Sequence, residues 1–232
     1  MIAFLAADPG SELCCWNLFV AGSDGSGVTR VTEGVTVIHY DFAANGSLLA
    51  YAPNEVTPRS LIVVRPDGTG RREITPAGAC CPQLPSLSPD GTKLAYFAYP
   101  QDQGPDGPGY EIYVVPTDGS GEAIDVSNNP GEDWWPVWSP DGNRIAFVSS
   151  APGTGFSPGS LHVVNADGTD QTTLTPAGGV WQPAWSTDGT RIVYAGGTGD
   201  RSHVFVANAD GSGATDLTPT SSESSRPTWT GR

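Results

Sequence analysis

Short runs of mostly apolar residues alternate with turn-forming residues along the whole chain. Five such runs are each followed, after a few residues, by an Asp-Gly pair: Leu18–Val20, Leu61–Val64, Ile112–Val115, Leu161–Val164 and Val204–Val206. Asp-Gly between apolar runs is a strong hairpin signal, because glycine adopts positive φ without strain and aspartate hydrogen-bonds to its own backbone. The pattern therefore predicts strands joined by tight turns throughout the chain.

A second Asp-Gly motif recurs in step with the first. It reads Ser-Pro-Asp-Gly followed by an apolar run, and its copies are Ser88–Tyr96, Ser139–Phe147, Ser186–Tyr194 and a degenerate one at Ala44–Tyr51. In the first motif, 186 residues separate Asp24 from Asp210 over four intervals, about 46.5 per repeat, so 232 residues hold about five repeats. Each repeat is one structural unit that buries its apolar face only against its neighbours.

Each repeat has room for four strands, and helices are close to excluded. The chain contains 30 glycines and 21 prolines, and the longest stretch without either has 11 residues. Four strands at a period of about 40 to 50 residues are typical of a propeller blade. We therefore predict an all-β fold, a single β-propeller domain over residues 1–232 with five blades of four antiparallel strands.

The innermost strand of a blade is expected to carry a Pro-x-Trp motif, found at Pro136–Trp138, Pro183–Trp185 and Pro227–Trp229. These three tryptophans occupy one equivalent position, which favours packing between blades. At the ends, Met1–Phe4 resembles a second strand with no inner strand before it, and residues 227–232 resemble an inner strand with no second strand after it. We expect the two to pair and close the ring, so that no sheet edge stays open.

These motifs, Pro-x-Trp-Ser-Pro-Asp-Gly followed by Ile-Ala-Phe, then Ile-Tyr-Val-Val and Leu-Thr endings, resemble the repeat of TolB-type β-propellers. The resemblance covers essentially the whole chain. Propellers of this family usually have six or seven blades, so five blades would be a departure. The resemblance also implies an exported protein, periplasmic or extracellular. The family includes protein-binding modules, gating domains of peptidases and carbohydrate lyases, and the fold alone does not choose among them.

Composition narrows the function further. The formal net charge of −14 argues against a nucleic-acid partner, because such proteins carry a basic face. No segment approaches the roughly 18 apolar residues of a membrane span, and Met1–Leu5 is too short and uncharged for a signal peptide. We expect no cofactor or metal site, although a structural cation in the central channel is compatible with the sequence, and we expect a monomer.

The four cysteines form two adjacent pairs, Cys14–Cys15 and Cys80–Cys81. In the propeller frame both pairs lie in loops on the same face, so disulfides across these loops are one interpretation. Free thiols are a second interpretation. A four-thiolate metal site is a third, although zinc sites favour a two-residue spacer that adjacent cysteines lack.

The same loop face gathers residues that the repeat does not explain. Aligned on the inner strand, His39, Leu84, Trp135, Gln182 and Arg226 share one position near the mouth of the central channel. Aromatic faces stack on sugars or cover apolar partner groups, and carboxylates accept hydrogen bonds. Packing of Trp134 and Trp181 over the core is the alternative. The candidate ligand-binding residues are Trp16, His39, Glu132, Asp133, Trp134, Trp135, Trp181, Glu223 and Arg226.

Enzymatic interpretations are weaker. Gly155–Gly159 fits the nucleophile motif G-x-S-x-G, but no helix follows it, and the three histidines do not form the cluster of the lyase relatives. The sequence therefore favours a non-enzymatic module that binds a peptide, protein or glycan. The first alternative is a glycoside hydrolase or lyase that uses the carboxylates Glu132, Asp133 and Glu223. A fragment or engineered form of a larger propeller, without a function of its own, is the second.

Overall fold

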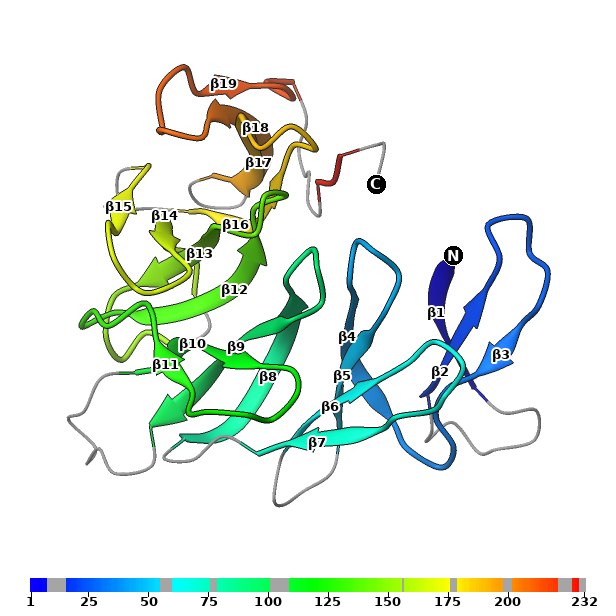
Figure 1. Cartoon of the computed structure of the whole chain (residues 1–232). Helices are drawn as coiled ribbons and strands as arrows, with labels where there is room; N and C mark the ends of the chain where they lie inside the picture. Colours follow the sequence, from blue (N-terminus) through cyan, green and yellow to red (C-terminus); the bar gives the residue numbers. More distant parts are fainter. Residues whose placement is uncertain are drawn as a thin grey trace.

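The computed structural model describes residues 1–7, 16–54, 60–75, 79–100, 109–155, 157–175, 179–197, 202–220 and 227–229. These residues form five antiparallel sheets arranged as an arc (Figure 1). Consecutive strands pair within each sheet, and no helix occurs among the described residues. Nothing in that part of the chain could therefore cross a membrane as a helix. The prediction of an all-β fold with five sheets, mostly of four strands, is confirmed.

We number these sheets as blades in chain order. The first blade contains β1 (Ile2–Ala7), β2 (Trp16–Ala21) and β3 (Thr29–Arg30), and the second contains β4 (Val37–Phe42), β5 (Leu49–Pro53), β6 (Leu61–Val64) and β7 (Arg72–Ile74). The third contains β8 (Ala79–Leu87), β9 (Lys93–Pro100), β10 (Glu111–Pro116) and β11 (Ile124–Asp125). The fourth contains β12 (Glu132–Trp138), β13 (Arg144–Ser150), β14 (Ser160–Asn165) and β15 (Thr172–Thr173), and the fifth contains β16 (Trp181–Trp185), β17 (Arg191–Gly196), β18 (His203–Asn208) and β19 (Thr215–Asp216).

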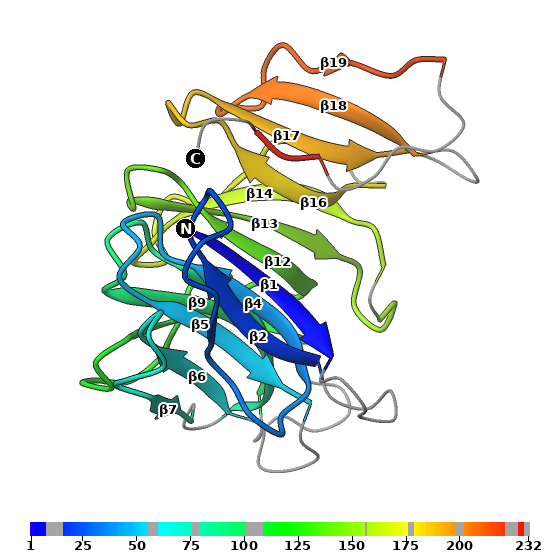
Figure 2. The same cartoon turned by 90° about the vertical axis from the view of Figure 1, so that its right-hand side faces the viewer.

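The first strand of each four-stranded blade is the inner one. Figure 1 shows β4, β8, β12 and β16 on the concave side of the arc, with the short strands β7, β11, β15 and β19 outside. Both views place the N-terminus and the 227–229 segment toward the opening between the first and fifth blades (Figures 1 and 2). Among the described residues, β1 pairs only with β2. Ring closure therefore stays a prediction.

The Asp-Gly turns have one common geometry. In the turn between β16 and β17 of the fifth blade, Asp188 Oδ1 accepts hydrogen bonds from the hydroxyl of Ser186 (2.6 Å) and the amide of Thr190 (3.0 Å). Gly189 follows with a φ of 68°, a conformation that glycine adopts without strain. The hydroxyl and amide donors hold the pKa of Asp188 at about 2, below its ordinary value. Each turn is thus built by its own side chains, as the sequence pattern predicts.

Apolar clusters join each blade to the next. One face of the third blade, with Leu94 and Tyr96 at its centre, packs on Leu61 and Val63 of the second, and the later boundaries repeat this arrangement. The second strands are buried because they lie between an inner strand and a third strand within the sheet. The core therefore lies between blades, which makes each blade depend on its neighbours.

The inner-strand tryptophans tie neighbouring blades by a repeated hydrogen bond. The indole Nε1 of Trp138 donates to the carbonyl of Ser86 (2.9 Å), and that of Trp185 donates to the carbonyl of Val137 (3.1 Å). In the third blade Leu87 takes the tryptophan position, and its amide donates instead to Oδ2 of Asp41 in the second blade (2.7 Å). The expectation that these tryptophans pack between blades is confirmed, and the indole N–H adds a directional bond.

We predict that Trp185→Phe lowers the free energy of unfolding by about 2 kcal/mol, because it leaves the half-buried carbonyl of Val137 without its donor and loses part of the packing of the buried indole. Urea denaturation measures the effect. Trp16→Phe is the matched control, since Trp16 is 48% exposed, and it should change stability by less than about 0.5 kcal/mol. Equal effects of the two substitutions would contradict the role of the indole bond.

The turn aspartates predict a loss of stability in acid. The folded-state pKa of Asp188 is depressed, so its contribution is present above the ordinary pKa of 3.8 and is lost as the pH falls toward about 2. We expect wild type to be more stable than Asp188→Asn at pH 6, and the two to converge as the pH approaches about 2. Thermal melts across this range measure it, and a constant difference would refute the assignment.

Candidate functional site

Strained backbone occurs on the inner strands, where the sequence analysis expects the mouth of the channel. Leu84, Trp135 and Gln182, which we call the rim residues, adopt positive φ values of 47°, 53° and 46°. Each directly precedes a proline of its inner strand, and each lies where the register with the second strand shifts. Proline has no N–H to donate, so the strand bulges at this point. Left-handed backbone costs a non-glycine residue about 1–2 kcal/mol, so the surrounding sheet must impose it.

The second blade shows what happens without the proline. Tyr40 stands at the proline position and pairs regularly with Tyr51, and the register shift moves toward the strand start, between Val37 and His39. His39, which the sequence alignment placed with the rim residues, is half-buried in this strand. Burial lowers the pKa of His39, which keeps its imidazole neutral near pH 7.

A cavity of about 410 Å³ follows the inner strands from the rim residues to the turns that join each inner strand to the second strand of its blade. All three rim residues line it. Among the described residues that line it, Asp41 is the one charged side chain. More than half of the lining residues are proline or aromatic: Tyr40, Phe42, Trp135, Trp138, Pro85, Pro89, Pro136, Pro140 and Pro183.

The tryptophans singled out from the sequence separate into two groups. Trp135 and Trp181 lie on neighbouring blades in edge-to-face contact, with ring centroids 5.6 Å apart, and both are half-buried. Trp134 differs from the expectation of an exposed residue: it is 3% exposed and packs against Phe97 and Tyr110. The bulge in β12 at this point explains the difference, since it interrupts regular strand alternation and leaves Trp135 at the rim. Trp16 is exposed at the start of β2 in the first blade.

A second cavity, of about 520 Å³, opens near the rim on the loop side of the third blade. Leu84 borders both cavities, and His39 and Gln83 supply polar groups. Phe97, Tyr110 and Trp134 form its aromatic floor. The two cavities and the Trp135–Trp181 pair together form the concave, aromatic part of the loop face.

The candidate carboxylates lie deeper than expected. Glu132 is 8% exposed, and its Oε1 accepts a hydrogen bond from the amide of Gly153 (3.1 Å). Asp133 is fully buried, and its Oδ2 accepts from the amide group of Asn129 (2.9 Å). Both are held by structural partners instead of projecting into the channel.

A third buried carboxyl, Glu111, escaped the sequence analysis. It begins β10, is 1% exposed, and its Oε2 accepts a hydrogen bond from Ser127 (2.6 Å). Burial raises the pKa of Glu111 to about 9, and burial raises that of Asp133 as well. The equivalent first residue of the third strand is Asn17, Ser60, Ser160 or His203 in the other repeats. This exception to the repeat was the signal that could have revealed Glu111.

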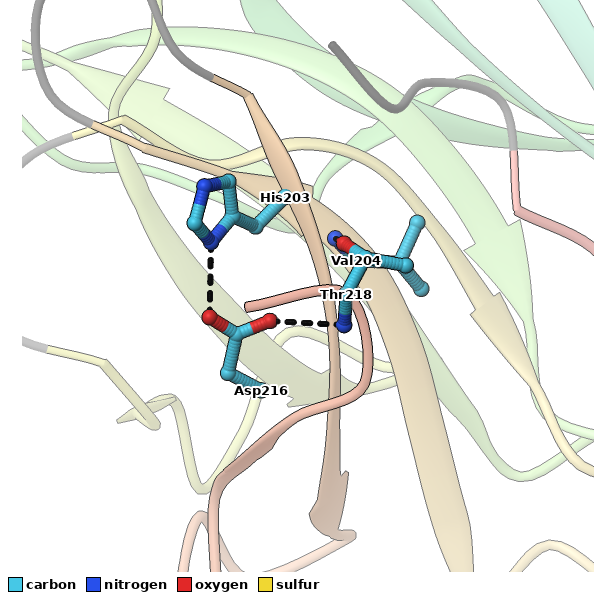
Figure 3. A network of polar contacts seen from close by, with 4 residues as sticks. All are labelled: His203, Val204, Asp216 and Thr218. Atoms are coloured by element: carbon cyan, nitrogen blue, oxygen red, sulfur yellow. Dashed lines mark hydrogen bonds and ion pairs between the residues drawn. The ribbon is translucent and has the colours of Figure 1, made fainter. Parts of the chain in front are cut away.

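His203 of the fifth blade takes part in a local structural network (Figure 3). Its Nδ1 lies 2.6 Å from Oδ2 of Asp216, and the amide of Thr218 donates to Oδ1 of the same carboxylate (2.8 Å). The Thr218 hydroxyl in turn accepts from the amide of Val204 (2.9 Å). The bond to His203 is the main reason that the pKa of Asp216 is lowered. The network fastens the outer strand β19 to β18, away from the channel.

Some candidates lie outside the described residues. These are Glu223, Arg226 and the first cysteine pair, Cys14 and Cys15. Cys80 and Cys81 are half-buried on β8, where Cys81 adopts a positive φ of 58° at the first of two register shifts. The disulfide interpretation therefore stays a prediction. Within the described ranges, no group of three or more His, Cys, Asp or Glu side chains is arranged to hold a metal ion.

A family model described as the TolB beta propeller domain matches residues 1–231, and the chain belongs to this family. The Tol-Pal system protein TolB of Alcanivorax borkumensis is 32% identical over 125 residues, which are 53% of this chain and 27% of that protein. The crystal structure of TolB from Acinetobacter baumannii superposes with a TM-score of 0.67 at 21% identity, over 96% of this chain and 54% of that one.

Enzymes share the same fold. An oligogalacturonate lyase in complex with manganese superposes with a TM-score of 0.66 at 19% identity, over 87% of this chain and 58% of the lyase. At these identities the structural likeness defines the fold alone. This chain spans 27% of the curated relative and about half the length of the TolB structure.

Proposed function

We propose that this TolB-type propeller is a non-enzymatic interaction module that recognises a peptide, protein or glycan on the loop face around the channel mouth. The observation that carries the proposal is the half-buried Trp135–Trp181 pair beside a cavity lined by proline and aromatic rings. Aromatic side chains that are partly desolvated and rigidly held contribute most to binding at protein interfaces. The strained bulge holds Trp135 in place before any ligand arrives, which lowers the entropy cost of binding.

The enzymatic alternative has less support. Glu132 and Asp133 are buried and already hydrogen-bonded, so neither is positioned as an acid or base facing a substrate in the channel. Neither cavity has a lysine or arginine among its described lining residues, so a polyanionic chain such as oligogalacturonate would lack a counter-charge. By family membership alone, we further propose an exported location, periplasmic or extracellular.

We also propose that the C-terminal segment completes the first blade. The indole Nε1 of Trp229 donates to the carbonyl of Ala184 (3.1 Å), which repeats the bond between Trp185 and Val137 one blade further on. This bond supports the proposal that Pro227–Trp229 acts as an inner strand beside the fifth blade, and the first blade contains three strands among the described residues. Pairing of this segment with β1 would close a five-bladed ring.

For the binding site, we predict that Trp135→Ala and Trp181→Ala each weaken binding at least tenfold, because each removes an aromatic anchor. A peptide library and a glycan array identify the ligand, and titration calorimetry measures its affinity. Ile124→Ala is the control, since Ile124 is 52% exposed on the outer strand β11 and should bind like wild type. Full affinity in the Trp135→Ala/Trp181→Ala double variant would rule out this surface. Glycan turnover that disappears in Glu132→Gln would favour the enzyme.

For ring closure, we predict that deletion of residues 226–232 lowers the melting temperature by about 10 °C, because it removes the tie to the fifth blade. Trp229→Phe should cause a smaller decrease, since it keeps most of the packing and loses only the indole bond. Calorimetric melts measure both. A deletion variant that melts like wild type would show that the segment does not complete the ring.

A further inference from the structure

One boundary between blades departs from the repeat in two places at once. At the seam between the third and fourth blades, Glu111 stands where the second and fourth blades have Ser60 and Ser160. Facing it, Asp133 stands at the inner-strand position occupied by Val180 in the fifth blade. Two carboxyl groups thus replace a hydroxyl and an aliphatic side chain. Both are almost completely removed from water, at 1% and 0% exposure.

The hydrogen bonds around the two carboxyls indicate where a proton resides. Asp133 Oδ2 accepts a hydrogen bond from the side-chain amide of Asn129 (2.9 Å), which favours the ionised form of Asp133, although burial outweighs this effect. Its buried Oδ1, however, receives no hydrogen bond from an amide, hydroxyl or indole in the described residues. The side chains of Glu111 and Asp133 interact with each other, and a protonated Glu111 is able to donate the hydrogen bond that this oxygen lacks. The arrangement is therefore a neutral acid donating to a carboxylate.

The surroundings disfavour a second negative charge. The charges that act on Glu111 are those of Asp133 and of Asp125 on β11, and both are negative. Tyr113 on β10 also interacts with Glu111, and Tyr110 and Glu132 are titratable neighbours in the chain of Glu111 and Asp133, respectively. Two ionised carboxylates in a buried contact repel each other strongly, so one proton must stay with the pair near neutral pH.

We propose that Glu111 and Asp133 hold one proton between them and make the packing of the third blade against the fourth depend on pH. In the unfolded chain both carboxyls ionise near their ordinary values, 4.5 and 3.8. Folding therefore takes up a proton, and stability falls as the pH rises from about 4.5 toward about 9. Above that range the proton is released to water, and the paired charges push the two blades apart.

The seam lies directly beneath the second cavity. Glu111 follows Tyr110 in the chain, Asp133 precedes Trp134, and Tyr110 and Trp134 form part of the cavity floor. The amide of Asp133 also donates to the carbonyl of Tyr110 (2.7 Å), a backbone bond that crosses from one blade to the other. Ionisation of the pair thus acts on the bond that positions this floor. The inference concerns the free protein and does not require a ligand.

Stability measured at pH 5, 7 and 9 by urea denaturation tests the proposal. For wild type we expect the folding equilibrium constant to fall by up to about tenfold per pH unit. Glu111→Gln keeps a donor for Asp133 without a titrating proton, so its stability should depend much less on pH. Glu122→Gln removes an exposed glutamate and should follow wild type. A wild-type slope that persists in Glu111→Gln would overturn the proposal.

Two further measurements keep the test decisive if Glu111→Gln folds poorly. The Glu111→Ser/Asp133→Val double variant restores the residue types of the other repeats and should lose the pH dependence. Carboxyl ¹³C NMR of wild type labelled at glutamate should show one glutamate still protonated at pH 7. If every glutamate titrates between about pH 4 and 5, the pair holds no such proton.

Hydrogen exchange locates the effect at the seam. The amide of Val180 donates to the carbonyl of Gly159 (3.0 Å), the equivalent bond at the boundary between the fourth and fifth blades. After correction for intrinsic rates, protection of the Asp133 amide should fall at least tenfold relative to that of Val180 between pH 7 and pH 10. Equal changes at both amides would show that ionisation does not act on this seam.

Discussion

The tie between inner strands is the interaction on which the rest of the structure depends. Each blade has its own hydrogen-bonded sheet, but the apolar clusters lie between blades, so a blade is stable only in contact with its neighbour. The indole bonds of Trp138 and Trp185 set how one inner strand lies against the previous one. Where Leu87 replaces tryptophan, the side chain comes from the earlier blade: the carboxylate of Asp41 accepts a hydrogen bond from the backbone amide of Leu87. The constraint is therefore kept while its chemistry changes.

Much of the architecture could be predicted because it is local and repeated. An Asp-Gly pair between apolar runs determines a hairpin without knowledge of the rest of the chain, and five copies determine the number of sheets. Trp185 was expected to be buried because its equivalents at the other repeats shared one environment. Ring closure was also predicted from the strand patterns at the two ends of the chain, and it stays a prediction, because among the described residues β1 pairs only with β2.

The site was harder to predict because it depends on the side to which each residue points. Trp134 and Trp135 are neighbours in the sequence, yet one joins the core and the other reaches the rim, since a bulge follows the first. Glu111 was overlooked because it occupies an ordinary repeat position, and only its carboxyl group is unusual. Comparison of residue types at each repeat position, in addition to the motifs, would have revealed it.

The bulge before each inner-strand proline has a consequence for how this surface can change. Leu84, Trp135 and Gln182 share one backbone conformation although their side chains are aliphatic, aromatic and amide. The sheet therefore imposes the conformation, and the side chain has little part in it. Substitutions at these positions can therefore change which side chains border the channel mouth, one blade at a time, while the backbone of each inner strand keeps its conformation. A single scaffold of this kind can acquire new partners during evolution through very few mutations.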